Sequence, residues 1–100
     1  MKRNIFGFVS EDTEIVQWFS EQTDFKRISI KEISKFDFVF IDINIANLKE
    51  NLKNIKKCKD IILFSSKKID TNKILDCMHY FSSNSNEVLF AKFDNLKENI

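Results

Sequence analysis

A continuous apolar run in the middle of the chain constrains the fold more than any other feature. Five of the six residues from Phe36 to Ile41 are apolar, and Asp42 follows directly. A strand with one face in water would alternate apolar and polar residues, so residues 36–44 predict a strand buried on both faces of a parallel sheet. Asp42 falls at the carboxyl end of this strand, and ligands of open α/β sheets bind at that edge.

The composition supports a single domain with a hydrophobic core. The 100 residues are 43% hydrophobic and 31% charged, which is the balance of a folded globular chain. Sixteen Lys and Arg residues against 15 Asp and Glu residues leave a net charge of +1, so no overall field favours nucleic acid or an anionic membrane. The lysine-rich segment 49–59 is interpreted as the solvated face of a helix, with a local basic patch as the alternative.

The cysteines and the hydropathy pattern bear on metal binding and location. Cys58 and Cys77 are 19 positions apart with only His79 nearby, so the spacing of a cysteine and histidine metal site is absent. We therefore expect two reduced thiols in a cytoplasmic protein. No segment approaches the roughly 18 consecutive apolar residues of a membrane span, and the first residues lack an apolar leader, so we expect no membrane contact.

Apolar periodicity divides the chain into alternating strands and helices. Expected strands are 4–10, 25–30, 36–44, 60–66 and 87–93; expected helices are 11–23, 45–57, 70–81 and a last one capped by Asp94, with a loop at 82–86. Residues 31–35 are too few for a crossover of about ten or more residues, so the second helix is expected to be shortened or missing. The alternation predicts one domain, 1–100, with a three-layer, flavodoxin-like doubly wound parallel sheet of strand order 2-1-3-4-5. The last helix, which stops at Ile100, is expected to be truncated.

Polar residues interrupt the apolar runs where four of the strands end. These residues are Ser10 and Glu11 after the first strand, Asp42 after the third, Ser65 and Ser66 after the fourth, and Lys92 after the fifth. In a 2-1-3-4-5 sheet these four strands are neighbours, so their carboxyl ends meet at one edge. We therefore expect two carboxylates, a hydroxyl and an ammonium group to gather there.

These strand ends resemble those of the receiver domains of bacterial two-component response regulators, and the resemblance covers nearly the whole chain. FVFIDIN at 38–44 resembles the phosphoacceptor strand, VSED at 9–12 the acidic strand end, IILFSS at 61–66 the switch-hydroxyl strand, and FAKFD at 90–94 the strand that ends in lysine. The resemblance implies a phosphoryl group on Asp42 that Lys92 and Ser65 contact. It also implies Mg²⁺ held by Glu11, Asp42 and the backbone carbonyl of Asn44, because a carboxylate that attacks a phosphoryl group needs a cation to screen charge.

The chain departs from the family pattern at several of these positions. Ser10 and Glu11 stand where the family usually has two adjacent acids, so metal affinity should fall. Phe93 follows Lys92 where the family has proline, and Leu89 stands at the position of the switch aromatic residue. Together with the short second connection, these substitutions predict a divergent receiver.

Three functions follow as alternatives, of which the first two are favoured. The first is a receiver-type signalling switch of a two-component phosphorelay, phosphorylated on Asp42 and contacting a histidine kinase or an effector, with no enzymatic turnover. The second is a pseudo-receiver, a phosphorylation-independent docking or homodimerising module that meets its partner through an apolar face around Met78, Phe81 and Leu96. The third is a small-molecule or nucleotide-binding domain, which ranks last because no glycine-rich phosphate loop follows the first strand.

Asp42 also has a purely structural interpretation. An acid at the end of a strand can cap the next helix or pair with a lysine such as Lys92, without any phosphate chemistry. This alternative carries about the same weight as the phosphoacceptor role. We expect no nucleic-acid partner for this domain.

Overall fold

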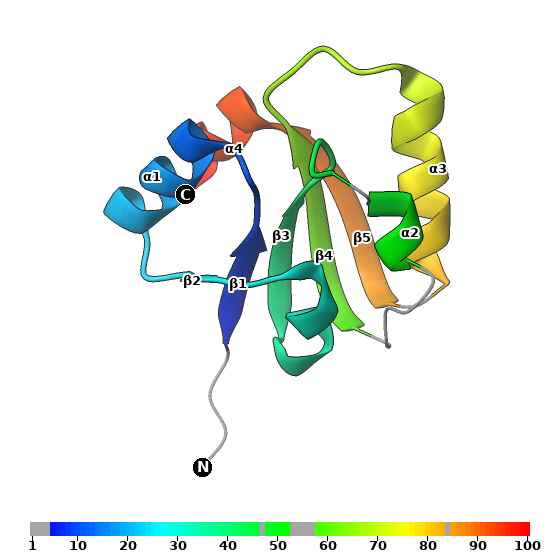
Figure 1. Cartoon of the computed structure of the whole chain (residues 1–100), viewed down its shortest axis with the longest axis horizontal. Helices are drawn as coiled ribbons and strands as arrows, with labels where there is room; N and C mark the ends of the chain where they lie inside the picture. Colours follow the sequence, from blue (N-terminus) through cyan, green and yellow to red (C-terminus); the bar gives the residue numbers. More distant parts are fainter. Residues whose placement is uncertain (1–4, 47, 53–57, 84) are drawn as a thin grey trace.

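Five strands alternate with helices along the chain. The computed structural model describes residues 5–46, 48–52, 58–83 and 85–100. The strands are β1 (Phe6–Val9), β2 (Lys26–Arg27), β3 (Phe38–Asp42), β4 (Cys58–Ser65) and β5 (Ser85–Lys92). The helices are α1 (Thr13–Gln22), the 3₁₀ helix η1 (Ile30–Lys35), α2 (Leu48–Leu52), α3 (Thr71–Ser82) and α4 (Phe93–Asn99) (Figure 1).

All four strand pairs are parallel, and the strand order is β2-β1-β3-β4-β5. The central strand β3 pairs with β1 through Phe40 opposite Phe8, and with β4 through Phe40 opposite Ile62. The strand ends therefore share one edge, at the top of Figure 1. This is the flavodoxin-like α/β sheet that the sequence predicted.

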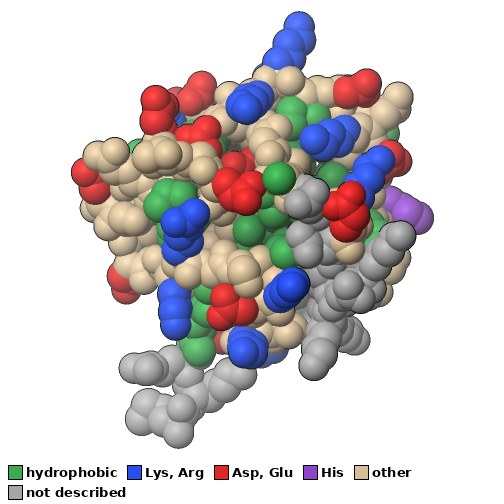
Figure 2. Space-filling model, viewed as in Figure 1, with side chains coloured by type: hydrophobic (Ala, Val, Ile, Leu, Met, Phe, Trp, Pro, Cys, Tyr) green, Lys and Arg blue, Asp and Glu red, His purple; other side chains and the backbone are tan. Residues whose placement is uncertain are grey.

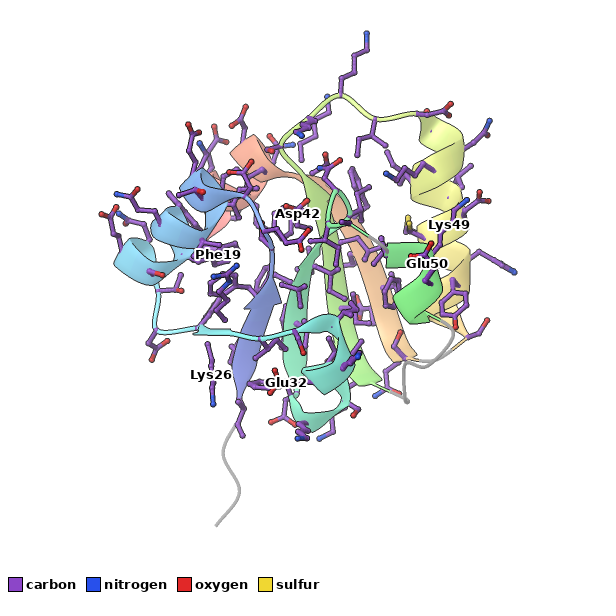
Figure 3. The ribbon with its side chains drawn as sticks, in the orientation of Figure 1. Phe19, Lys26, Glu32, Asp42, Lys49 and Glu50 are labelled. Atoms are coloured by element: carbon purple, nitrogen blue, oxygen red, sulfur yellow. The ribbon has the colours of Figure 1, made fainter. Side chains whose placement is uncertain are left out.

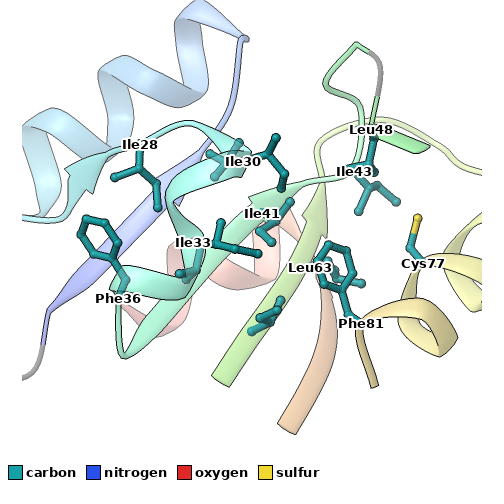
Figure 4. Packing of buried hydrophobic residues seen from close by; sticks show 13 residues of the cluster. Ile28, Ile30, Ile33, Phe36, Ile41, Ile43, Leu48, Leu63, Cys77 and Phe81 are labelled. Carbon is teal, nitrogen blue, oxygen red and sulfur yellow. The ribbon is translucent and has the colours of Figure 1, made fainter. Parts of the chain in front are cut away.

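Each face of the sheet carries its own hydrophobic cluster, because neighbouring side chains on a strand point to opposite faces. Val39 and Ile41 pack under η1, α2 and α3, together with Cys77 and Phe81 of α3 (Figure 4). Phe40 faces the other way, toward α1 and α4, where Phe19 of α1 is fully buried among aromatic rings (Figure 3). The prediction of a strand buried on both faces is confirmed, but β3 spans Phe38–Asp42 and is shorter than the predicted range 36–44.

The connection from β2 to β3 is a single short 3₁₀ helix, as the length of the link predicted. The backbone N–H and the hydroxyl of Ser29 both donate to the Glu32 carboxylate, at 3.1 and 3.2 Å, which forms a capping box at the start of η1. Ile30 and Ile33 of η1 are buried, so this short helix covers this part of the sheet. Strand β2 is shorter than predicted, with two residues at the sheet edge.

Helix and strand boundaries differ from the predicted ones at several places. Asp70 caps α3, and α3 and β5 take up most of the predicted loop 82–86. Helix α4 begins at Phe93 with Lys92 as its N-cap residue, two residues earlier than predicted, so Asp94 lies in its first turn instead of capping it. Helix α2 starts at Leu48 rather than residue 45, and residues 53–57 of the predicted helix lie outside the described part of the chain.

The apolar face that was expected to meet a partner does not exist as one surface. Phe81 packs in the cluster under α3, whereas Leu96 packs in the cluster on the opposite side of the sheet, and both are buried. Alternation of helices on the two sides of the sheet separates them. Among the described helices, none combines the length and the apolar character needed to cross a membrane.

Candidate functional site

Asp42 is buried at the end of β3 and accepts hydrogen bonds on both carboxylate oxygens. Its side chain lies at the carboxyl edge of the sheet (Figure 3), and the residue is 2% exposed. The Ser10 hydroxyl donates to Oδ2 at 2.7 Å. The backbone N–H and the side-chain Nδ2 of Asn44 donate to Oδ1, at 2.9 and 3.1 Å. The three donors together compensate for removing this polar group from water.

A hydrogen-bond network extends from Asp42 across the neighbouring strand end. Asn44 Nδ2 also donates to Ser65 Oγ at 2.8 Å, and this hydroxyl in turn donates to the Lys67 carbonyl at 3.0 Å. The Lys67 N–H donates back to the same hydroxyl at 3.0 Å. The ends of β1, β3 and β4 are therefore joined through Ser10, Asp42, Asn44 and Ser65.

The orientation of the Ser10 hydroxyl is fixed by its surroundings. The Asp12 N–H donates to Ser10 Oγ at 3.1 Å, so the hydroxyl proton is available for Asp42. The Asp12 side chain caps α1 by accepting from the N–H groups of Glu14 and Ile15. Arg27 Nη2 donates to the Ser10 carbonyl at 3.1 Å, which ties the end of β1 to strand β2. Ser10 is thereby held as a hydrogen-bond donor to the carboxylate.

A small cavity of about 200 Å³ opens beside Asp42. It is lined by Glu11, Asp12, Asp42, Asn44, Ile45, Ser66 and Lys67. Glu11 is exposed, and its Oε1 accepts from the Ala46 N–H at 2.8 Å, which joins the loop after β3 to the start of α1. The structure thus brings Glu11, Asp42 and Asn44 to one cavity, as expected, and adds Lys67, which the sequence analysis did not single out.

Lys92 does not line the cavity beside Asp42. It lines a separate cavity between the ends of β4 and β5, together with Ser65. Lys92 shares its face of β5 with Val88 and Phe90, which pack in the cluster under α3, whereas Asp42 shares the opposite face of the sheet with Phe40. Strand alternation accounts for the separation of the two side chains.

Mg²⁺ prefers several oxygen ligands that are free to turn toward it. Within the described residues, no group of three or more His, Cys, Asp and Glu side chains is arranged to hold a metal ion. Ser10 supplies a hydroxyl and not a carboxylate, and both Asp42 oxygens already accept hydrogen bonds. The residues of this edge therefore fit Mg²⁺ poorly.

Comparison of the chain with protein-family models, curated proteins and solved structures found no match. The geometry of the sheet edge therefore carries the functional interpretation.

Two titratable groups with perturbed pKa values lie away from this edge. Hydrogen bonds from the Ser29 N–H, and next from the Ser29 hydroxyl, hold the pKa of Glu32 below its ordinary value. Burial raises the pKa of the Cys77 thiol, which lies free and 5% exposed beneath α3. The side chain of Cys58 lies outside the described part of the structure, so the expectation of two reduced thiols stays a prediction.

Proposed function

We propose that this chain is a receiver-like signalling domain that works by protein contact and without phosphorylation of Asp42. The flavodoxin-like sheet and the residues at its strand ends support the receiver-like part of the proposal. The hydrogen bonds of Asp42 support the phosphorylation-independent part. In this role the carboxylate acts as a structural acceptor that fastens three strand ends together.

The observation that carries the proposal is that both oxygens of the Asp42 carboxylate already accept hydrogen bonds. A nucleophilic oxygen must approach the phosphorus atom in line, with metal and ammonium groups beside it to neutralise charge. Here Ser10 donates to Oδ2 and Asn44 donates twice to Oδ1, while Lys92 lines a different cavity. Phosphoryl transfer would have to break these hydrogen bonds inside a buried site.

Contact with a partner is supported by exposed apolar side chains on α3 and on the edge strand β5, which lie on opposite faces of the sheet. Leu75 on α3 is 56% exposed, and Leu89 on the edge strand β5 is 51% exposed. Large apolar side chains at the edge of a sheet are sites of protein association. We propose that a signalling partner or a second copy of this chain meets the domain at the edge strand β5, around Leu89, which points to the face of the sheet opposite α3.

A second candidate function is the phosphorylated switch itself. It is favoured by the open cavity beside Asp42, which Glu11 and Lys67 line and which has space for a small anion. In that case Lys67, not Lys92, would be the cation nearest the acceptor.

Incubation with acetyl phosphate and Mg²⁺, followed by intact mass spectrometry, separates the two functions. The proposal expects no phosphoryl adduct on the wild-type chain. An adduct that is present in the wild type and absent from Asp42→Asn would overturn it in favour of the switch. The Asn variant is a suitable control because its amide keeps the size of the carboxylate and retains an acceptor for Asn44.

A further inference from the structure

A second cavity at the carboxyl edge has a different chemical character from the one beside Asp42. It lies between the ends of β4 and β5, next to the first turn of α3, and has a volume of about 560 Å³. Its lining residues are Ser65, Ser66, Lys67, Lys68, Ile69, Thr71, Ile74, Phe90, Lys92, Phe93 and Asp94. This volume is within the range of roughly 300 to 1,000 Å³ that is typical of small-molecule sites.

The polar lining of this cavity is mainly cationic. Lys67, Lys68 and Lys92 line it, and none of them forms an ion pair within the described residues. The one lining acid, Asp94, lies 3.4 Å from Lys97 and is partly neutralised by it. Blue side chains stand along the top of the molecule in Figure 2, over the loop from β4 to α3. In a chain with a net charge of only +1, this concentration of unpaired lysines favours an anionic ligand.

The loop that carries two of these lysines is fixed in place. Ser65 is 3% exposed, and its hydroxyl both accepts from the Lys67 N–H and donates to the Lys67 carbonyl. At the other end of the loop, Asp70 caps α3 by accepting from the Asn72 N–H at 2.8 Å. The loop therefore needs little further ordering when a ligand binds, which reduces the entropic cost of binding.

The remaining wall of the cavity is apolar. Ile69, Ile74 and Phe90 line it and are half-buried, so each presents part of its surface to the cavity. A bare inorganic anion would leave this wall in contact with water. An anionic group that is part of a larger organic molecule would let that molecule cover the apolar wall, because burial of apolar surface is favourable.

A larger cavity, of about 710 Å³ beside β2, is a weaker candidate. Its acidic and basic side chains are balanced, and three of them already have partners. Arg27 donates to the Ser10 carbonyl, Glu32 accepts from Ser29, and Glu11 accepts from the Ala46 N–H. These three groups are already engaged in hydrogen bonds within the fold.

We propose that the cavity between β4 and β5 binds a phosphorylated small molecule. The phosphoryl group lies against Lys67, Lys68 and Lys92, and the organic part packs on Phe90. Lys92 acts there on a free ligand and not on Asp42. This inference is independent of the proposed function, because it holds whether or not Asp42 accepts phosphate.

The test uses ADP and inorganic pyrophosphate as probes, with adenosine as the probe that lacks phosphate. Isothermal titration of the full chain is expected to show saturable binding of ADP, weaker binding of pyrophosphate and none of adenosine. Added salt is expected to weaken the binding, because the ligand is held by ammonium groups. Backbone amides of Ser66, Lys68, Thr71 and Lys92 are expected to shift together in the NMR spectrum.

A matched pair of variants locates the site. The double variant Lys68→Gln and Lys92→Gln is expected to weaken ADP binding by about tenfold or more, since it removes two charge-assisted contacts. The control double variant Lys26→Gln and Lys35→Gln changes two exposed lysines on β2 and η1 and is expected to bind like the wild type. Lys26 is labelled in Figure 3, far from the carboxyl edge.

Three results would overturn the inference. One is the absence of saturable binding of ADP and pyrophosphate. Another is equal weakening in the two double variants, which would indicate only a general charge effect. The third is binding of a polyglutamate peptide without binding of either phosphate compound, which would assign the lysines to an acidic protein partner.

Discussion

Ser10 Oγ lies 2.7 Å from Asp42 Oδ2, and both residues are at least 97% buried. In the alignment that the resemblance to two-component receivers implies, Ser10 takes the place of an acid, and a hydrogen bond then stands where two like charges would otherwise meet. A buried pair of carboxylates repels unless a cation lies between them. With serine at this position, the strand ends can be held together without metal.

Removal of the Ser10 hydroxyl should destabilise the fold. Ser10→Ala leaves a buried carboxylate oxygen without its donor, so we expect the free energy of unfolding to fall by about 1 to 3 kcal/mol. Urea denaturation followed by circular dichroism measures the change. Ser66→Ala, at an exposed serine of the same sheet edge, is the matched control and should change stability little. Equal effects of the two substitutions would contradict the role given to Ser10.

Substitutions of Asp42 should separate hydrogen bonding from charge. In Asp42→Asn the amide oxygen can still accept from Asn44 while the amide nitrogen donates to Ser10, so we expect a loss of about 1 kcal/mol. Asp42→Ala leaves the donors of both Ser10 and Asn44 unsatisfied and should cost about 3 kcal/mol or more. Denaturant unfolding of both variants tests this order. An Asn variant as unstable as the Ala variant would show that the charge, not the hydrogen-bond pattern, stabilises the site.

An acid introduced at position 10 should create a dependence of stability on Mg²⁺. Ser10→Asp places a second carboxylate against Asp42, so without divalent cations we expect a lower melting temperature than in the wild type. Millimolar Mg²⁺ should raise it again, because an ion that binds only the folded state stabilises that state. Ser10→Asn has the same size without the charge and should not respond to Mg²⁺. A wild-type chain stabilised by Mg²⁺ as strongly as Ser10→Asp would contradict the poor fit described for this edge.

The strand order could be predicted because it depends on pattern alone. Residues 36–41 and 61–64 are apolar on both faces, which only a covered parallel sheet accommodates. The five residues between the second and third strands excluded a full crossover helix, and η1 occupies that space. Asp12 and Asp70 stood at helix starts in the sequence and cap α1 and α3 in the structure.

The arrangement within the site depends on the direction in which each side chain points. The polar residues at the strand ends did not reveal that direction. Lys92 and Asp42 were grouped because both end a strand, but the sheet register and strand alternation place them on opposite faces. Lys67 lies in a loop, and no periodicity points to where a loop side chain goes. The side chain of Asn44 bridges Asp42 and Ser65 across two strands. The sequence did indicate a contact between Asn44 and Asp42, because Asp and Asn two positions apart at a strand end favour a local turn.

The capping box of η1 predicts a pH dependence of the connection between β2 and β3. The folded-state pKa of Glu32 is lowered, so its contribution to stability is present above the pKa of an unfolded glutamate and is lost as the pH falls through the lowered value. Ser29→Ala removes the hydroxyl donor but keeps the backbone N–H, so the pKa of Glu32 should rise only part of the way. Carboxyl NMR titration of both chains measures this. An unchanged Glu32 pKa in the variant would show that the hydroxyl contributes nothing.

The most direct measurement of the central claim is a titration with beryllofluoride in the presence of Mg²⁺. Beryllofluoride mimics an aspartyl phosphate and does not depend on the lifetime of a phosphoryl adduct. Trp18 is a suitable reporter because its ring packs edge-on against Phe93, 5.6 Å between centroids, directly after β5. If Asp42 is a structural acceptor, Trp18 fluorescence and the backbone amide signals of Ser10 and Ser65 should stay unchanged. A saturable change in the wild type that is lost in Asp42→Asn would contradict the account.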